Sequence, residues 1–473
     1  MGKPVKNPLF NIALSLITSL TLSGCLKMGP DFQTPDTGIH IPDAYQHVPE
    51  EQGTPLKTQW WHVFNNPDLN HTVDEVLKNN LDIQKAYAVI LEIQSRFIQT
   101  RANRFPMLSL DGQFRKEKRP IFGILPTGSF TTRTETYTLS LPASFELDLW
   151  GRLARSEEAA LAELLQAEEN RWTVVQIIVA ETITLHLQKV SLERRIQITE
   201  ESIKNYQDSF ALVERRYERG LSSILDLKQA SRTLAQAETE LPSLRQELGI
   251  TQQKMAVLMG QYPETSPPRI QPEDYFKPLE PVPPGLPSEL LMNRPDIRAA
   301  EAGLRALNAR IGEAKASRFP KITLTGTFGY ASEELNRLFK PESELWSVAS
   351  GLSQPLFDAG KLKAGQKAAE AGYQQGFSEY AKTLLTAFSE VETALLTRKE
   401  QMIRRNRVLN FLNEARAVQD VAETRYNRGL TDYLTVLESQ RTRFQAEKDL
   451  VMVDLAILTN RVSLHRALGM GWK

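Results

Sequence analysis

Two copies of one short motif decide the architecture: the chain reads RYERGL at residues 216–221 and RYNRGL at residues 425–430. Other matching segments keep the same order, namely LDI at 81–83 with PDI at 295–297, RFP at 104–106 and 318–320, and LWGRL at 149–153 with DAGKL at 358–362. Each match recurs after about 209 to 214 residues. A unit of that length is too long for a solenoid repeat. We therefore expect an internally duplicated fold whose two halves lie side by side.

The start of the chain predicts export and a lipid anchor. A lysine-bearing start and an apolar segment at residues 9–22, too short and too early to span a membrane, precede LSGC at 22–25. Cys25 is the only cysteine and lies where a lipobox needs its thiol, because diacylglycerol is attached through sulfur. We expect residues 1–24 to be a lipoprotein signal peptide, and Cys25 to carry diacylglycerol and an N-acyl chain. The alternative is an ordinary secretory signal in which Cys25 is incidental.

Composition excludes several classes of protein. The 57 basic residues balance the 57 acidic ones, so no net basic field favours nucleic acid as a partner. Beyond the signal, the longest apolar run lies near residues 174–180, far short of the roughly 20 residues of a transmembrane helix. If the mature chain crosses a membrane, we expect it to do so as β-structure. Leu26 follows Cys25 where an aspartate would suggest inner-membrane retention, so similarity to the lipoproteins of enveloped bacteria favours the outer membrane.

The order of extended and helical patterns divides the chain. Residues 25–68 are predicted to be a lipid-anchored N-terminal arm, 69–260 the first structural repeat, 261–293 a Pro-rich linker and 294–473 the second repeat. Each repeat should contain a helix, two strands, a long helix and a return helix. The first of these helices is predicted over residues 69–104 and ends at Pro106.

Apolar and polar residues alternate in four segments. The alternation covers residues 108–114, 137–147 and 322–330, and a less regular version runs through 346–352. Gly123, Pro126, Gly128 and Ser129 are predicted to form the loop between the first two strands. A soluble hairpin packed on helices is one reading of these strands. A membrane-spanning reading needs strands from several chains, because single-chain barrels begin at about eight strands.

The long helices carry a heptad pattern. Apolar residues mostly recur at alternate spacings of three and four from Val175 to Tyr217, which predicts left-handed supercoiling. We expect long helices over 155–216 and 361–425, and return helices over 223–260 and 431–469. The second long helix is polar even along its seam, at Arg398, Gln401 and Arg405, which is typical of the wall of a water-filled tunnel. A plain coiled-coil rod is the alternative, but it gives the alternating strands no role.

These residues together resemble the outer membrane factors, the TolC-like exit ducts of tripartite efflux and secretion systems. The resemblance covers nearly all of the mature chain and is carried by GPDF at 29–32, LPSELL at 286–291, RPDIRAAE at 294–301, QPLFDAG at 354–360 and both RYxxGL turns. Asn293 departs from the arginine usual before Arg294. Lipidation and the RPDI motif look like the NodT-like lipoprotein subgroup that serves pumps of the resistance-nodulation-division (RND) type.

The resemblance implies an α+β membrane protein that forms a homotrimer. Four strands per chain would give a trimeric twelve-stranded outer-membrane β-barrel, continued by a long periplasmic α-helical barrel. Such a duct would passively conduct drugs or other small toxic compounds from an inner-membrane RND-type pump and a periplasmic membrane-fusion adaptor, with outer-membrane lipid around it. The alternatives are a type I protein secretion channel and a non-conducting coiled-coil lipoprotein.

The same resemblance assigns roles at the two turns. It places an adaptor-docking surface at the periplasmic tip, made by Arg216, Gly220, Leu221, Ser222, Arg425, Gly429, Leu430 and Thr431. It places a periplasmic gate at Leu434, Glu438 and Tyr426, with three copies of Glu438 forming a carboxylate ring. Thr435 stands where some relatives carry another acidic residue. The alternatives are that the turns are only helix caps and that Glu438 is only a solvated carboxylate.

No catalytic or metal-binding pattern is present in the sequence. The six histidines are scattered and lack the spacing of a zinc site, and there is no Gly-rich phosphate loop. Trp60 and Trp61 are read as a packing or interface pair and not as part of a ligand site. We therefore expect no enzyme activity, no metal and no cofactor beyond the acyl chains on Cys25.

Overall fold

The computed structural model describes residues 27–47, 59–122, 129–272, 276–277, 279, 282, 287 and 293–469. The signal peptide, Cys25, part of the predicted arm and linker, and Gly123, Pro126 and Gly128 of the predicted loop lie outside these residues. The chain divides into two compact units, each of which draws residues from both predicted repeats. The sheet unit comprises 1–37, 90–167 and 300–380, and the helical unit comprises 38–89, 168–299 and 381–473.

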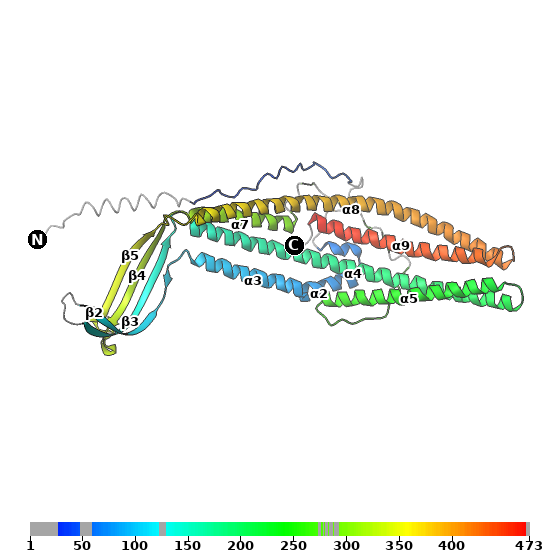
Figure 1. The fold of residues 1–473 in the computed structure, drawn as a ribbon. Helices are drawn as coiled ribbons and strands as arrows, with labels where there is room; N and C mark the ends of the chain where they lie inside the picture. The colour runs from blue at the N-terminus through cyan, green and yellow to red at the C-terminus, as the bar shows by residue number, and fades with distance from the viewer. Residues whose placement is uncertain are drawn as a thin grey trace. The chain divides into compact units, whose positions relative to one another are not determined.

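The sheet unit contains one antiparallel sheet whose strands lie side by side in Figure 1. Its strands are β1 (Met107–Leu108), β2 (Asp111–Phe122), β3 (Ser129–Leu147), β4 (Lys321–Ser332) and β5 (Glu344–Ser353). β1 and β2 pair with β3 in one continuous register, and the gap between them lies opposite Pro142, which has no N–H to donate. Ser109 still donates its N–H to the Pro142 carbonyl at 3.1 Å. In effect, the described sheet has the four strands that the sequence predicts.

The first hairpin is longer than predicted, and Ser129 is not in a loop. β2 continues eight residues beyond Phe114, and β3 begins at Ser129 instead of Tyr137. The added segment of β3 is rich in threonine, a β-branched residue that favours strands. Because its charged and threonine side chains do not alternate apolar with polar, the sequence pattern missed it.

The two faces of the sheet differ sharply in polarity. Register places Leu110, Phe114, Leu141, Phe328 and Trp346 on the apolar face, with threonine and serine at the alternate positions on the polar face. The apolar face is also uncovered, since Trp346 is 72% exposed and Val348 is 82% exposed. An exposed apolar area of this kind indicates contact with a nonpolar environment or a partner.

A buried arginine joins the N-terminal segment to the helices of the sheet unit. Arg155 lies in helix α4 (Arg152–Glu218) and donates to the Met28 and Gly29 carbonyls, each at 3.1 Å. It also pairs with Asp31 at 2.9 Å. Gly29 packs so closely on Gly312 of helix α7 (Pro295–Ala316) that an added Cβ would lie 2.6 Å from the Gly312 Cα. The GPDF motif therefore fixes the start of the described chain.

The predicted helix over residues 69–104 is wrong as a single element. The structure has α2 (Pro67–Asn79) and α3 (Leu81–Ala102), separated by Asn80 in an extended conformation. Asn80 is buried, and its side chain accepts hydrogen bonds from the N–H groups of Asp82 and Ile83 and donates to the Leu258 carbonyl at 2.9 Å. This cap competes with continuation of the helix, which explains the break.

The helical unit is built from the two long helices and their return helices. α4 and α8 (Lys361–Asn427) extend into it, followed by α5 (Ile224–Leu258) and α9 (Tyr433–Leu468), which confirms the four predicted helices within a few residues. Within this unit, α5 lies beside α4 and α9 beside α8, joined by the ion pairs Arg245–Glu200 and Arg416–Glu447, both at 2.9 Å (Figure 1). Among the described residues, no helix combines the length and apolar composition needed to cross a membrane.

Burial on α4 is wider than a single heptad seam. Val175, Ile196 and Val213 of the predicted seam are buried, but so are Val179 and Ile183, which lie off it. α4 therefore packs on more than one side. On α8 the polar seam is partly neutralised, because Arg405 pairs with Asp454 of α9 at 2.5 Å and stacks over Phe276.

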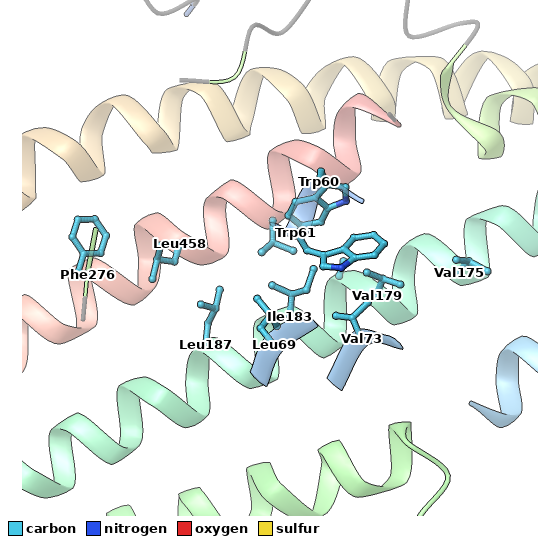
Figure 2. Packing of buried hydrophobic residues seen from close by; sticks show 12 residues of the cluster. Trp60, Trp61, Leu69, Val73, Val175, Val179, Ile183, Leu187, Phe276 and Leu458 are labelled. Atoms are coloured by element: carbon cyan, nitrogen blue, oxygen red, sulfur yellow. The ribbon is translucent and has the colours of Figure 1, made fainter. Parts of the chain in front are cut away.

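A hydrophobic core beside α2 is built around a tryptophan pair that precedes this helix in the chain. Trp60 and Trp61 form a short 3-10 helix (Trp60–Phe64), and Figure 2 shows them packed against Leu69, Val73 and Ile183. Both tryptophans are buried, which confirms their reading as packing residues. The Trp60 ring also stacks on the imidazole of His465, with 4.2 Å between the ring centroids.

The RPDI motif contains a second buried arginine that joins separate parts of the chain. Arg294 is buried and binds Asp296 through two nitrogens, at 2.7 and 3.0 Å. It also pairs with Glu390 of α8 at 2.7 Å and donates to the Ala467 carbonyl near the end of α9 at 3.0 Å. Pro295 begins α7, a position where its missing N–H costs nothing. The motif therefore joins three helices of the helical unit.

The fold predicts a specific sensitivity of β4 to side-chain size. A Cβ at Gly329 would lie 2.3 Å from the Leu139 carbonyl oxygen, whereas at Gly326 the nearest atom is 3.7 Å away. Gly329→Ala should therefore force β3 and β4 apart and lower the free energy of unfolding by roughly 1–3 kcal/mol. Gly326→Ala is the matched control and should be near neutral in denaturant titrations of the detergent-solubilised protein. Equal midpoints for the two variants would contradict this account.

Burial of His465 predicts acid sensitivity. Burial, together with the charge of Arg461, lowers the pKa of His465 to about 2, so the folded chain holds it neutral. The unfolded chain protonates it near pH 6.5, so stability is lost as pH falls below that value, by about 2 kcal/mol between pH 7 and 5.

Replacing His465 with glutamine keeps an acceptor for the 2.9 Å hydrogen bond from Arg461 and removes the titrating group. His465→Gln should therefore flatten the pH dependence of the unfolding midpoint. His71→Gln, at an exposed position of α2, should leave it unchanged. An unaltered slope in His465→Gln would refute the assignment.

Candidate functional site

The two RYxxGL motifs fold into the same helix-terminating turn. Gly220 and Gly429 have φ angles of +71° and +72°, a left-handed conformation that glycine adopts at low cost. In the first turn, Gly220 and Leu221 donate to the carbonyls of Tyr217 and Arg216, each at 2.8 Å. In the second, Gly429 and Leu430 donate to Tyr426 and Arg425, each at 2.9 Å. The duplication therefore extends to individual hydrogen bonds.

Both turns present apolar side chains outward. Leu221 is 73% exposed and Leu430 is 61% exposed. An added Cβ at Gly220 or Gly429 would meet no atom within 4 Å. Within one chain, backbone conformation alone requires these glycines, and there is room for a larger side chain.

Polar side chains cap the helix that follows each turn. Ser223 and Asp226 form a capping box at the start of α5, and the Ser222 hydroxyl donates to Asp226 at 2.9 Å. Asp432 caps α9 by accepting from the Thr435 N–H at 3.0 Å and from its hydroxyl at 2.6 Å. These bonds from Thr435 lower the pKa of Asp432. Thr435 is therefore a capping partner of Asp432 here.

The two motif arginines play unequal roles. The Arg216 guanidinium lies 4.2 Å over the Tyr426 ring, and its Nη1 donates to the Tyr426 carbonyl at 3.5 Å. Arg425 donates to the Leu430 carbonyl within its own turn, at 3.4 Å. Arg216 therefore connects the first turn to the second, which brings a predicted docking residue onto a predicted gate residue.

The predicted gate residues do not share one surface. Tyr426 is buried and lies against Tyr433, with ring centroids 5.8 Å apart. Leu434 and Glu438 are exposed and lie one turn apart on α9. Within one chain, only Leu434 and Glu438 are available to line an opening.

Sequence reasoning missed a cation beside Glu438. Arg441 donates from Nη1 to the Glu438 carboxylate at 2.9 Å. The i, i+3 spacing of these two residues on a helix was the signal that could have found it. Both line a groove of about 400 Å³ together with Glu240 and Lys448, which form their own ion pair at 2.7 Å.

A second groove lies beside the second turn. It has a volume of about 440 Å³ and is lined by Val418, Val421, Arg425, Thr431 and Thr435 among others. Val418 and Val421 are exposed. Two of the predicted docking residues, Arg425 and Thr431, therefore border an open groove with apolar side chains.

The part of the chain that the structure describes shows no cluster of three or more histidine, cysteine or acidic residues able to hold a metal ion. Its buried histidines pack against aromatic or amide groups: His186 lies 3.2 Å from the Asn66 amide nitrogen. Burial, with the charge of Lys189, lowers the pKa of His186 to about 4. Both features indicate structural roles for these histidines.

Comparison with known proteins gives a consistent result. The family model described as outer membrane efflux protein matches residues 72–261 and 286–470. The solvent efflux pump outer membrane protein SrpC of Pseudomonas putida is 32% identical over 466 residues, covering 97% of this chain and 98% of that protein. The cation efflux system protein CusC of Escherichia coli is 30% identical over 464 residues, with 97% and 98% covered.

Solved structures agree with the sequence relatives. The outer-membrane channel OprN superimposes with a TM-score of 0.87 at 28% identity, covering 94% of this chain and 99% of that one. A crystal structure of CusC gives a TM-score of 0.83 at 28% identity, with 93% and 99% covered.

Proposed function

Because the chain belongs to the outer membrane efflux protein family, which is a family of efflux ducts and not of enzymes, we propose that three copies assemble into one conduit across the outer membrane. Its location in the outer membrane and its part in efflux follow from the family. The trimer, the shared barrel, the lipid anchor and the gate are the finer steps of the proposal.

The sheet carries this proposal. Its apolar face is exposed and its other face is lined by threonine and serine. Within the part of the chain that the structure describes, β5 and the interrupted β1–β2 strand each pair on one side only. A single chain with two open edges leaves backbone groups unsatisfied in lipid, whereas three chains paired edge to edge would close a twelve-stranded barrel. The apolar face would then meet lipid and the polar face would line water.

The lipid anchor is proposed at Cys25. The arm just after it is fixed by Arg155 through Met28, Gly29 and Asp31, so acyl chains two residues before Lys27 would be tethered to the sheet unit by a short link. Several acyl chains together give stable anchoring, and the same tether would keep the protein associated with outer-membrane lipid.

Partners and cargo follow as proposals from the relatives. SrpC is by its name part of a solvent efflux pump, and CusC part of a cation efflux system. For this chain we assign small toxic compounds such as drugs as cargo, delivered by an inner-membrane RND-type pump through a periplasmic adaptor. The duct itself would be passive, and the pump would select the cargo.

The two turns are proposed as the adaptor-docking surface. Leu221 and Leu430 are exposed beside glycines that have open space around them. The groove bordered by Arg425 and Thr431 adds apolar surface next to the second turn. An adaptor that contacts the backbone and small residues here could bind when glycine is present, but a large side chain at the same position would block its contact.

Docking at the second turn predicts a size effect at Gly429. Gly429→Trp places a bulky side chain in open space, so the trimer should form while export of a fluorescent drug from cells is abolished. Gly429→Asn is the control, because asparagine tolerates the left-handed conformation and adds little bulk. It should retain most export, and normal export with Gly429→Trp would sink the docking proposal.

The main test of the duct is assembly and conduction by the purified protein. The detergent-extracted protein should have the native mass of three lipidated chains and conduct weakly in a planar bilayer. Leu434→Ala combined with Glu438→Ala should raise conductance severalfold, because it removes the apolar constriction and the carboxylate ring. Glu414→Ala, at an exposed position of α8, should have no effect. A stable monomer would contradict the shared barrel. Unchanged conductance in the double variant would contradict the proposed gate.

A further inference from the structure

Beyond the apolar face, the first hairpin carries an unusual pair of charges. Lys118 of β2 and Arg133 of β3 are direct partners in the register. Directly opposed residues have Cβ atoms roughly 4.5–5.5 Å apart, and like charges at that distance repel. Both side chains are exposed. The fold therefore brings two cations together at a cost.

The other cations of this hairpin have carboxylate partners. Lys116 pairs with Glu135, directly opposite it. Arg115 and Arg119 both contact Glu117, at 3.7 and 3.0 Å. Within the described residues, no ion pair joins Lys118 or Arg133 to a carboxylate. Pairing of β3 with β4 ends at Tyr137 and Ser332, so no β4 residue lies opposite Arg133 either.

Alternation fixes the side of the sheet on which this pair lies. Lys118 and Arg133 fall on the same face as Phe114 and Tyr137, the apolar face, whereas Arg115, Glu117 and Arg119 fall on the polar face. Phe114 and Tyr137 are themselves paired, with ring centroids 4.8 Å apart. Lys118 lies four residues beyond Phe114, or about 13 Å along the strand.

Aromatic residues mark this end of the apolar face. Tyr137 of β3 and Tyr330 of β4 are the last apolar residues of their strands on this face toward the turns, and Phe114 of β2 pairs with Tyr137. The rings of Tyr330 and Phe339 are in contact, with 5.7 Å between their centroids. Aromatic side chains concentrate where membrane hydrocarbon meets the headgroups. The Lys116–Glu135 pair follows on the same face, and Lys118 and Arg133 come next, about 13 Å beyond Phe114 and Tyr137. At that distance from the aromatic residues they would reach the lipid headgroups.

Chain order tells which surface of the membrane this is. α3, α4, α7 and α8 all connect to the opposite end of the strands, so the β2–β3 and β4–β5 connections share the end away from the α-helices. With the helices on the periplasmic side, as the proposed function requires, the turn end faces the exterior.

We propose that Lys118 and Arg133 form a site for the phosphate of a lipid headgroup in the outer leaflet. This inference rests on the proposed membrane orientation. A lipid phosphate would supply the negative charge that the pair lacks, and an arginine can bind two phosphate oxygens at once. A phosphorylated glycolipid fits best, because its acyl chains would cover the apolar face while its phosphate reaches the cations. In a three-chain assembly the site would occur three times around the outer rim.

The test uses the full-length lipidated protein in detergent, mixed with lipid A that carries both phosphates and analysed by native mass spectrometry. Lys118→Gln with Arg133→Gln should weaken binding by about 30-fold, since each cation near an anionic headgroup contributes roughly fivefold. Arg115→Gln with Arg119→Gln is the matched control: it removes the same charge from the same hairpin but on the polar face. It should bind like the parent protein.

Further measurements distinguish a lipid phosphate from a free phosphate ion and show which results would overturn the proposal. Lipid A stripped of its phosphates should bind the parent protein and the Lys118/Arg133 variant equally. Millimolar inorganic phosphate should not displace the intact lipid, and displacement would assign a free-anion site instead. Equal lipid A binding by the two double variants would overturn the proposal. Because binding is measured without conduction, a non-conducting protein that still binds lipid A would count against the duct and not against this site.

Discussion

Backbone hydrogen bonding at the edges of the sheet is the constraint on which the proposed assembly depends. Among the described strands, β5 and the β1–β2 strand each pair on one side only, and the face between them is apolar and exposed. The apolar face calls for hydrocarbon around it, where each unpaired N–H or C=O costs several kcal/mol. A single chain cannot meet both demands. In the proposed trimer, pairing the β5 edge of one chain with the β1–β2 edge of the next would meet both demands together.

Buried arginines make the connections that hydrophobic packing does not specify. Arg155 holds the start of the described chain through backbone carbonyls, and Arg294 joins α7, α8 and α9 through two carboxylates and a carbonyl. Long helices with apolar residues on several sides could slide by a turn and still bury similar area. A buried cation with fixed partners cannot slide, because displacement would leave its charge unpaired at a cost of about 3–5 kcal/mol. Arg294 therefore sets the register of α7, α8 and α9 where they meet, and Arg155 fixes the N-terminal segment on α4.

Much of this fold could be predicted from periodicity, because strands and long helices repeat a signal over many residues. The break at Asn80 was missed because one side chain that caps α3 and binds the Leu258 carbonyl leaves no periodic trace. The turn side of the first hairpin was missed because its β2 half is mostly charged and its β3 half alternates threonine with charged residues. Neither half alternates apolar with polar residues. At the turns, the duplicated motif identified both glycines, but the contact of Arg216 with Tyr426 joins residues far apart in sequence and required the structure. The roles of these residues in docking and gating depend on other chains, which one sequence does not describe.

The ion pair at Glu438 changes the electrostatic reading of the proposed gate. Three bare carboxylates around an axis would repel one another and favour partial protonation. Here each Glu438 has its own cation in Arg441, and Glu240 and Lys448 form a second pair in the same groove. Local neutralisation lets the carboxylates approach one another without a large penalty, so a narrow resting tip is compatible with charge at the axis. It also weakens the attraction of such a ring for cations. In the proposed gate, the apolar side chain of Leu434 would then resist passage more than the charge does, and opening would require the helices to separate.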